Sequence, residues 1–425
     1  MLRSKYLNQL IEKKGNGQIK VITGLRRVGK SYLLFELFRG HLLASGVTPE
    51  QIVSLALDDD VNMRYRNPLE LSQYVRSRIK DSEREYFVFL DEIQKVQSVP
   101  NPYLPDSDEQ IGFVDVLLGL QKLKNVDIYV TGSNSRMLSS EVLTEFRGRG
   151  DEIHMMPLSY REFREACEDK QNAWRDYFTY GGMPYILSLK NHEAKSKYLK
   201  DLFEQIYVRD VLERKRIRAS QSVLNDLLDV VSSSVGSLTN PLKISNTFAS
   251  ERKLQINSTT VDDYLGYFAE AFLLEKAKRY NIKGRKYIGS LYKYYYTDVG
   301  LRNARLNFRQ TEENHIMENI IYNELLFRGF DVDVGVVEFV KVENGKQKRQ
   351  QLEVDFVANK GSNRYYIQSA LSVADEEKRL QEINSLNRIH ESFKKIVVVK
   401  DNIVPWYDEK GVFYVGIEEF LLSEL

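Results

Sequence analysis

The first third of the chain alternates short apolar runs with helical patterns. Ile19–Thr23 is such a run, and its near-continuous apolar character is typical of a strand buried on both faces. The residues after the following turn, Ser31–Phe38, have helical spacing, and Gly40 closes that pattern. Further strands are predicted at Ile52–Asp60, Tyr86–Gln94 and Val126–Ser135. Strands that alternate with helices predict a doubly wound α/β domain with a parallel sheet, here assigned to residues 1–165.

The rest of the chain divides into three further segments. Residues 166–220 have helical spacing and are predicted to form a helical lid. Residues 221–305 have the element order of a winged helix, with three helices followed by the strands KAKRYN and YKYYYTD. Residues 306–425 begin with a helix, and the strands QLEVDFVAN, RYYIQSALSV and KKIVVVKD follow it. This last segment is predicted to be a small α/β domain.

Composition excludes several classes of protein. The 61 basic and 60 acidic side chains nearly balance, so any nucleic-acid surface must be local. The single cysteine, Cys167, rules out an internal disulfide and is expected to be a small buried residue. The N-terminus lacks the features of a signal peptide, and no apolar window reaches the length of a membrane span, so a cytoplasmic location is expected. None of the five histidines has metal-ligand spacing, and no structural zinc is expected.

The turn after the first strand matches the phosphate-loop pattern G-x-x-x-x-G-K-[ST]. Glycines let backbone amides curl around phosphate oxygens, a lysine reaches the β- and γ-phosphates, and the hydroxyl that follows it can bind Mg²⁺. The helix that leaves the loop points its positive end at the anion. The pattern predicts an ATP site whose residues are Gly24, Leu25, Arg26, Arg27, Val28, Gly29, Lys30, Ser31 and Tyr32.

Two acids end the apolar strand at Tyr86–Gln94. The carboxyl ends of parallel strands meet at one edge of a sheet, so Asp91 and Glu92 are expected beside the phosphate loop. Asp91 is predicted to hold Mg²⁺ together with Ser31, and Glu92 to polarise the attacking water. A glutamate directly after the aspartate favours hydrolysis over a kinase reaction.

The strand at Val126–Ser135 ends in small polar residues. Ser133 and Asn134 are candidates for a γ-phosphate sensor, with Thr131 behind them. An ordinary polar loop after a strand explains any one of these residues equally well.

Five motifs in this order resemble a group of prokaryotic AAA-superfamily ATPases that carry a C-terminal domain similar to restriction endonucleases. The motifs are GLRRVGKS, FLDEIQ, TGSNS, FRGRGDEIHMMPLSYREF and YGGMPYIL. The resemblance covers nearly the whole chain, and PLSYREF and GGMP make it specific. It implies an arginine that reaches an ATP γ-phosphate in the same chain or in a neighbouring subunit; Arg149 is the first candidate and Arg147 the second. A surface arginine in a glycine turn is the alternative.

A local basic patch lies in the predicted wing. Between Ala271 and Tyr296 there are seven basic residues and one acid, Glu275. Tyrosines lie among them, and double-stranded DNA is a possible partner. The candidate contacts are Lys276, Lys278, Arg279, Lys283, Arg285 and Lys286. The alternative is a solvated hairpin in which lysine stems cover the tyrosines.

The C-terminal segment keeps only part of a nuclease pattern. Glu318 lies on its helix, and Glu353 and Asp355 lie on its first predicted strand. The next strand has Gln368–Ser369–Ala370 where nucleases that the segment resembles have Glu-x-Lys. Without that lysine the segment is expected to be catalytically degenerate and to serve in binding or assembly.

These patterns together predict an ATP-hydrolysing protein that switches or remodels a partner, which is a protein or DNA. A nucleotide-gated binding module with negligible turnover is the first alternative, and a metal-dependent nuclease is the second. The sequence leaves the oligomeric state open, and a homo-oligomer would be required if Arg149 acted on a neighbouring subunit.

Overall fold

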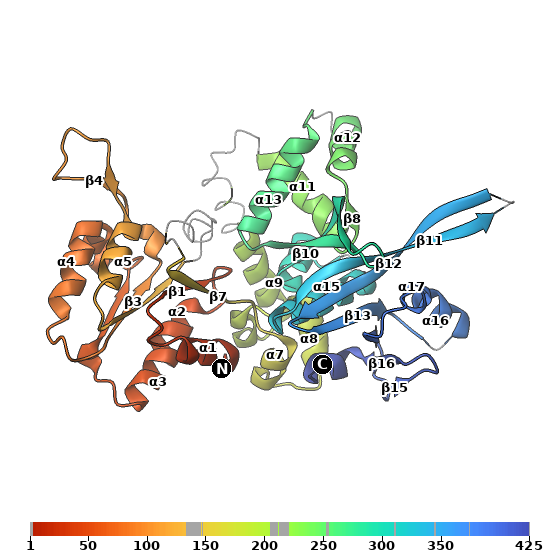
Figure 1. Cartoon of the computed structure of the whole chain (residues 1–425), viewed down its shortest axis with the longest axis horizontal. Helices are drawn as coiled ribbons and strands as arrows, with labels where there is room; N and C mark the ends of the chain where they lie inside the picture. The colour runs from red at the N-terminus through yellow and green to blue at the C-terminus, as the bar shows by residue number, and fades with distance from the viewer. Residues whose placement is uncertain are drawn as a thin grey trace. The chain divides into compact units, whose positions relative to one another are not determined.

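The computed structural model describes residues 3–132, 146, 148–204, 211, 221–251, 255–309, 312–343, 346–373 and 375–424. The chain forms two compact units, Met1–Met156 and Pro157–Leu425 (Figure 1). No helix in the described part of the chain is long and apolar enough to span a membrane.

The first unit is built on a five-stranded parallel sheet with the strand order β2-β3-β6-β1-β7. The predicted α/β class and parallel sheet are therefore confirmed. The strands are β1 (Ile19–Thr23), β2 (Ile52–Ala56), β3 (Tyr86–Asp91), β6 (Val126–Thr131) and β7 (Gly150–His154). The sequence pattern did not predict β7, because this edge strand fully buries only Ile153 and reads as polar.

Helices cover both faces of this sheet. α4 (Pro68–Arg78) and α5 (Phe113–Gln121) share one apolar core with it. On the other face, the ring of Phe38 packs against the rings of Phe89 and Tyr129. The remaining elements are α1 (Ser4–Glu12), α2 (Lys30–Tyr32), the π-helical η1 (Leu33–Phe38), α3 (Arg39–Ala44), the 3₁₀ turns η2 (Pro49–Gln51), η3 (Asp60–Arg66) and η4 (Ile93–Lys95), and the short strands β4 (Val99–Pro100) and β5 (Gln110–Ile111).

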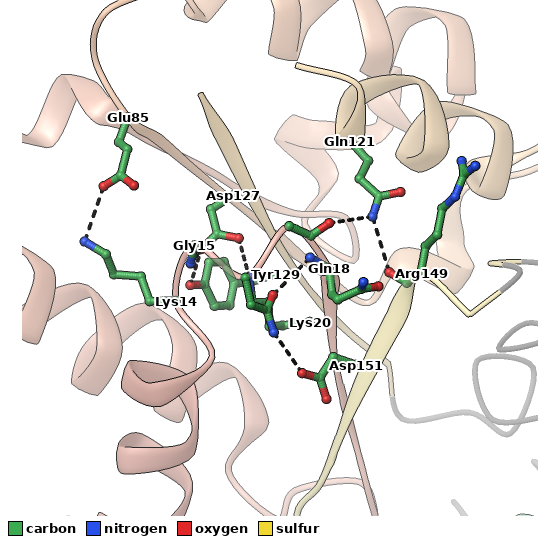
Figure 2. Close-up of polar contacts among 12 residues, drawn as sticks. Lys14, Gly15, Gln18, Lys20, Glu85, Gln121, Asp127, Tyr129, Arg149 and Asp151 are labelled. Carbon is green, nitrogen blue, oxygen red and sulfur yellow. Dashed lines mark hydrogen bonds and ion pairs between the residues drawn. The ribbon is translucent and has the colours of Figure 1, made fainter. Parts of the chain in front are cut away.

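A buried ion pair lies toward the amino end of β1 (Figure 2). Lys20 is fully buried and pairs with Asp127, whose carboxylate also accepts hydrogen bonds from the Gly15 N–H at 2.9 Å and the Tyr129 hydroxyl at 2.6 Å. Burial lowers the pKa of Lys20, while Asp127 opposes that shift. The pair explains how a lysine can lie within a buried, mostly apolar strand.

The second unit is built on a nine-stranded mixed sheet with the order β15-β16-β14-β13-β12-β11-β9-β10-β8. Its strands are β8 (Leu238–Thr239), β9 (Leu274–Asn281), β10 (Lys286–Tyr296), β11 (Asp331–Glu343), β12 (Lys346–Lys360), β13 (Asn363–Ala370), β14 (Lys394–Val399), β15 (Trp406–Tyr407) and β16 (Val412–Gly416). β9 pairs with β11 in parallel at Val334–Val336. The predicted winged-helix and C-terminal segments therefore share one sheet across the expected boundary at residue 305.

The second unit also contains helices in addition to its sheet. They are α7 (Tyr160–Ala166), α8 (Ala173–Tyr180), η6 (Pro184–Ser188), α9 (His192–Asp201), α11 (Gln221–Ser233), α12 (Pro241–Glu251), α13 (Ser258–Glu270), α14 (Val299–Arg305), α15 (Glu313–Phe327), α16 (Glu376–Glu382), α17 (Asn384–Asn387) and α18 (Ile417–Leu422). β11 and β12 form a long ribbon that extends beyond the rest of the sheet (Figure 1).

The GGMP motif has a packing role in this unit. Asp298 is buried, and its carboxylate accepts hydrogen bonds from the N–H of Gly182 at 2.7 Å and of Leu301 at 3.1 Å. Gly181 has φ +72°, and a Cβ there would lie 2.2 Å from Asp298 Oδ1. A Cβ on Gly182 would lie 2.2 Å from the Leu158 carbonyl oxygen. Only glycine permits these two approaches.

We expect Gly182→Ala to lower the free energy of unfolding by about 1–3 kcal/mol, because the added methyl meets backbone that cannot move aside. Thermal or urea unfolding measures the loss. Gly266→Ala is the matched control, since a Cβ at Gly266 in α13 has nothing within 4 Å. That control is expected to leave stability unchanged or to raise it by up to about 1 kcal/mol. Equal stability of Gly182→Ala and wild type would contradict this explanation of the motif.

Candidate nucleotide site

Four strands of the first unit end at the same edge of the sheet. The phosphate loop follows β1, Asp91 ends β3, Thr131 ends β6 and His154 ends β7. All four strands run in parallel, so their carboxyl ends lie side by side. The fold thus brings together the loop and the acidic pair that the sequence analysis predicted from separate motifs.

The phosphate loop needs its glycines for two different reasons. Gly24 has φ +131°, and a Cβ there would lie 2.2 Å from the Met155 carbonyl oxygen. Gly29 has φ +104° and precedes the first turn of α2. A side chain at position 24 would therefore collide with the backbone that follows β7. Gly29 is needed because it adopts a left-handed backbone conformation directly before α2.

Lys30 is turned back onto its own loop. Its Nζ donates hydrogen bonds to the carbonyl oxygens of Gly24 at 2.9 Å and Leu25 at 2.8 Å, and only 5% of the residue is exposed. Burial lowers the pKa of Lys30 to about 8, although Glu92 and Asp91 oppose the shift. The direct partners of this buried ammonium are thus two neutral carbonyl oxygens and not carboxylates.

The two predicted magnesium ligands are in contact. The side chain of Ser31 is hydrogen-bonded to Asp91, which also accepts a hydrogen bond from the Thr131 hydroxyl. Burial raises the pKa of Asp91 above its ordinary value, and these two hydrogen bonds oppose the rise. A hydroxyl and a carboxylate at one point are ligands that Mg²⁺ accepts, so the residues present fit this ion.

Glu92 is held in an unusual backbone conformation beside Asp91. Its φ is +52°, and its N–H donates to the Thr131 hydroxyl oxygen at 3.2 Å. The amide of Gln94 donates to the Glu92 carboxylate. A non-glycine residue in the left-handed region is uncommon and is often found at functional sites. Gln94 was not predicted as a site residue, although it stands in the quoted motif FLDEIQ.

Thr131 connects the acidic pair to the neighbouring strand, because its hydroxyl contacts both Asp91 and the backbone of Glu92. The predicted sensor residues Ser133 and Asn134 lie outside the described residues. Their role stays a prediction.

His154 is a second residue that the sequence analysis did not single out. Its Nδ1 lies 3.2 Å from Thr23 Oγ1, and that hydroxyl donates to Glu152 at 2.7 Å. Burial lowers the pKa of His154 to about 4, and the Lys30 charge adds to the effect. The imidazole is therefore neutral at pH 7. No sequence signal pointed to His154, because the strand that it ends was not predicted.

The other loop residues differ in exposure. The side chains of Leu25 and Val28 are buried, so these residues can offer a phosphate only their backbone amides. Arg27 is exposed, with φ +61°, and Tyr32 is also exposed. Arg26 is half-buried.

Arg149 lies at the opposite end of the sheet. The Ile19 N–H donates to its carbonyl oxygen at 2.9 Å, and the Gln121 amide donates to the same oxygen at 3.4 Å (Figure 2). Arg149 thus lies beside Ile19, the first residue of β1, whereas the phosphate loop begins at Gly24, directly after the last. The length of β1, about 16 Å at 3.3 Å per residue, separates the two. Arg149 therefore cannot reach the phosphate loop of its own chain in this conformation. The second candidate, Arg147, lies outside the described residues.

The predicted basic patch is only partly a free surface. Arg279 is buried, Lys276 lies 3.8 Å from the centre of the Tyr292 ring, and Arg285 pairs with Glu391 at 3.5 Å. A lysine ammonium thus lies over a tyrosine ring in part of the patch. Four of the named residues are exposed: Lys278, Lys283, Arg285 and Lys286.

Two of the nuclease-like positions of the second unit, Glu318 and Asp355, are buried, and Glu353 is partly exposed. They lie near a lysine that the sequence analysis had counted in the basic patch. Lys293 contacts Glu318 at 2.8 Å and Glu353 at 2.6 Å. Gln368 is the acceptor of a 3.4 Å hydrogen bond from the Asp355 N–H, and Ala370 is buried.

Two family models match the chain. Residues 16–164 match the AAA domain, and residues 171–312 match a domain of unknown function, DUF8612. Among solved structures, the Walker-type ATPase of Pyrococcus abyssi aligns with a TM-score of 0.48 and 15% identity, over 72% of this chain and 95% of that chain.

Two relatives match nearly the whole chain. An uncharacterized protein of Methanocaldococcus jannaschii is 28% identical over an alignment 446 residues long, which covers 98% of this chain and 88% of that protein. An uncharacterized protein of Haemophilus influenzae is 32% identical over 402 residues, which cover 93% of this chain and 92% of that protein. The chain therefore belongs to the same family as the Haemophilus influenzae protein, and its first unit carries an AAA domain.

Proposed function

We propose that the first unit binds ATP with Mg²⁺ and hydrolyses it, and that the cycle switches how the protein acts on a partner. One observation supports this most strongly. Ser31 contacts Asp91, and Thr131 contacts both Asp91 and the backbone of Glu92. These contacts join the phosphate loop, the predicted magnesium ligand and the predicted base into one connected set.

Binding of ATP uses the loop backbone and Lys30. The amides between Gly24 and Ser31 face the phosphates, and the Lys30 ammonium leaves the two loop carbonyls for the β- and γ-phosphate oxygens. Ser31 and Asp91 would hold the metal, which when bound offsets the negative charge of the phosphates. The neutral His154 adds no charge to this edge at pH 7.

Hydrolysis needs a water that is oriented toward the γ-phosphate. Glu92 is the candidate base, since its backbone is fixed by the bond to Thr131 and its carboxylate is held by Gln94. The hydrogen bond from Gln94 to the Glu92 carboxylate also favours an alternative function, which is nucleotide binding without turnover. A protein in which Gln94 kept its hold on Glu92 after ATP bound would bind nucleotide without turnover.

Arg149 is proposed to act on a neighbouring copy of the chain. Its place at the far end of β1 separates it from its own loop. An arginine at that end of one sheet can still face the nucleotide of the next subunit, where it would stabilise the charge of the leaving phosphoryl group. This role requires at least a dimer.

Double-stranded DNA is one candidate partner of the switch. The exposed residues Lys278, Lys283, Arg285 and Lys286 could contact the phosphate backbone, although Glu391 already pairs with Arg285. An unidentified protein is the other candidate.

Steady-state ATP hydrolysis, measured with and without double-stranded DNA, tests the proposed activity. Glu92→Gln is expected to lower kcat by about 10²–10⁴-fold while ATP binding persists, because the base is lost and the phosphate loop is intact. Lys30→Ala is expected to lose binding as well. A Glu92→Gln protein with wild-type turnover would contradict the assigned role, and a stimulation by DNA would identify that partner.

ATP affinity is expected to fall as the pH rises above 8. The free protein holds the pKa of Lys30 at about 8, and bound phosphates would raise it. Binding above pH 8 must therefore take up a proton, and between pH 7 and pH 9 the Kd should increase about tenfold. Titration of a fluorescent ATP analogue at several pH values measures the change. Lys30→Arg, whose guanidinium stays charged over this pH range, should show no such pH dependence, and the same dependence in that variant would assign it to another group.

Mixing two inactive variants tests the role of Arg149 in a neighbouring subunit. Arg149→Ala should lower kcat by about 10³-fold or more without loss of ATP binding. Its mixture with Lys30→Ala should regain hydrolysis, since an intact loop of one variant then meets the intact arginine of the other. Activity of Arg149→Ala equal to wild type would exclude the role. A mixture that stays inactive although the variants co-assemble would exclude action between subunits.

A further inference from the structure

The second unit contains a buried cluster that combines one ammonium group with several carboxyl groups. Lys293 on β10 is 3% exposed, and its Nζ lies 2.8 Å from Glu318 Oε1 and 2.6 Å from Glu353 Oε1. The Tyr295 hydroxyl donates to the same Glu318 oxygen at 2.6 Å. Asp355 is also buried, and it accepts a hydrogen bond from the Ser369 N–H at 2.8 Å.

The electrostatics show that this cluster is built around a cation. Burial alone would lower the pKa of Lys293, but Glu318, Asp355 and Glu353 raise it above its ordinary value. Burial and the nearby Glu318 raise the pKa of Asp355 well above its ordinary value, while the Lys293 ammonium opposes that rise. One ammonium is in direct contact with two carboxyl groups, those of Glu318 and Glu353. Without the ammonium, buried negative charge would remain uncompensated.

The three carboxyl groups come from two elements that are distant in sequence. Glu318 lies on α15, and Glu353 and Asp355 lie on β12. The turn at Gly236 packs closely on the first of them, where a Cβ would lie 3.2 Å from Glu318 Oε1. Carboxylate oxygens that converge in this way are the ligand type that divalent cations prefer. Yet no group of three or more His, Cys, Asp or Glu side chains in the described parts of the chain is arranged to hold a metal ion.

We propose that the Lys293 ammonium is a built-in cation of the second unit, which occupies the place among Glu318, Glu353 and Asp355 that a divalent metal would otherwise take. The wild-type cluster is closed to metal, and removal of the Lys293 side chain opens a metal site. The O···Nζ distances of 2.6–2.8 Å exceed the 2.3–2.6 Å of Ca²⁺–oxygen bonds only slightly, so the carboxylates need little movement. The 34% exposed side chain of Glu353 gives the ion a route from solvent.

Calcium titration calorimetry in the absence of nucleotide tests the proposal without any activity assay. The full-length wild type is expected to bind no Ca²⁺ at this cluster. Lys293→Met is expected to bind one Ca²⁺ per chain, and the double variant Lys293→Met/Asp355→Asn to lose that binding. One bound Ca²⁺ in the wild type that Asp355→Asn removes would overturn the proposal, as would a folded Lys293→Met protein that binds none.

Thermal unfolding supplies the matched control. Lys293→Met is expected to melt below the wild type, and saturating Ca²⁺ should recover most of that shift. Lys20→Met in the first unit also removes a buried lysine, but there a single carboxylate, that of Asp127, contacts the ammonium. Its loss of stability should not respond to Ca²⁺. If Lys293→Met does not fold without the ion, Lys293→Gln takes its place, and the wild-type titration alone can still refute the proposal.

Discussion

The parallel register of the five-stranded sheet is the constraint on which the candidate nucleotide site depends. Because β1, β3, β6 and β7 run in one direction, their carboxyl ends deliver the phosphate loop, Asp91, Thr131 and His154 to one edge. In the same register, Arg149 lies at the opposite edge, beside the amino end of β1. A single topological fact therefore brings the parts of the candidate site to one edge of the sheet and places Arg149 at the other edge.

Three buried lysines show which groups stabilise a positive charge that is removed from water. Lys20 is paired with one carboxylate, Lys30 rests on two backbone carbonyls, and Lys293 lies among several carboxyl groups. Only Lys30 has neutral partners in direct contact, and its pKa falls to about 8. That difference supports the proposal that Lys30 receives the phosphates of ATP, whereas the other two lysines already have their counter-charges.

Much of the site could be predicted from sequence because its parts are local motifs. The loop from Gly24 to Ser31 and the pair Asp91–Glu92 each lie within a few residues, and the strands before them have clear apolar patterns. Partners that are distant in sequence were missed. His154 is the last residue of an edge strand that reads as polar. Lys293 lies 25 residues from Glu318 and was counted in the basic patch. The sheet continues across residue 305 because β9 pairs with β11, which no local pattern reveals.

The central claim is that the connected set at the sheet edge performs chemistry and does not only bind ATP. A single-turnover measurement tests this most directly. Wild-type protein in excess over γ-labelled ATP and Mg²⁺ is quenched over time, and free phosphate is compared with intact nucleotide. The account predicts that bound ATP is converted to ADP and phosphate in the wild type and stays intact in Glu92→Gln. Recovery of intact ATP from saturated wild-type protein, including in the presence of double-stranded DNA, would contradict it.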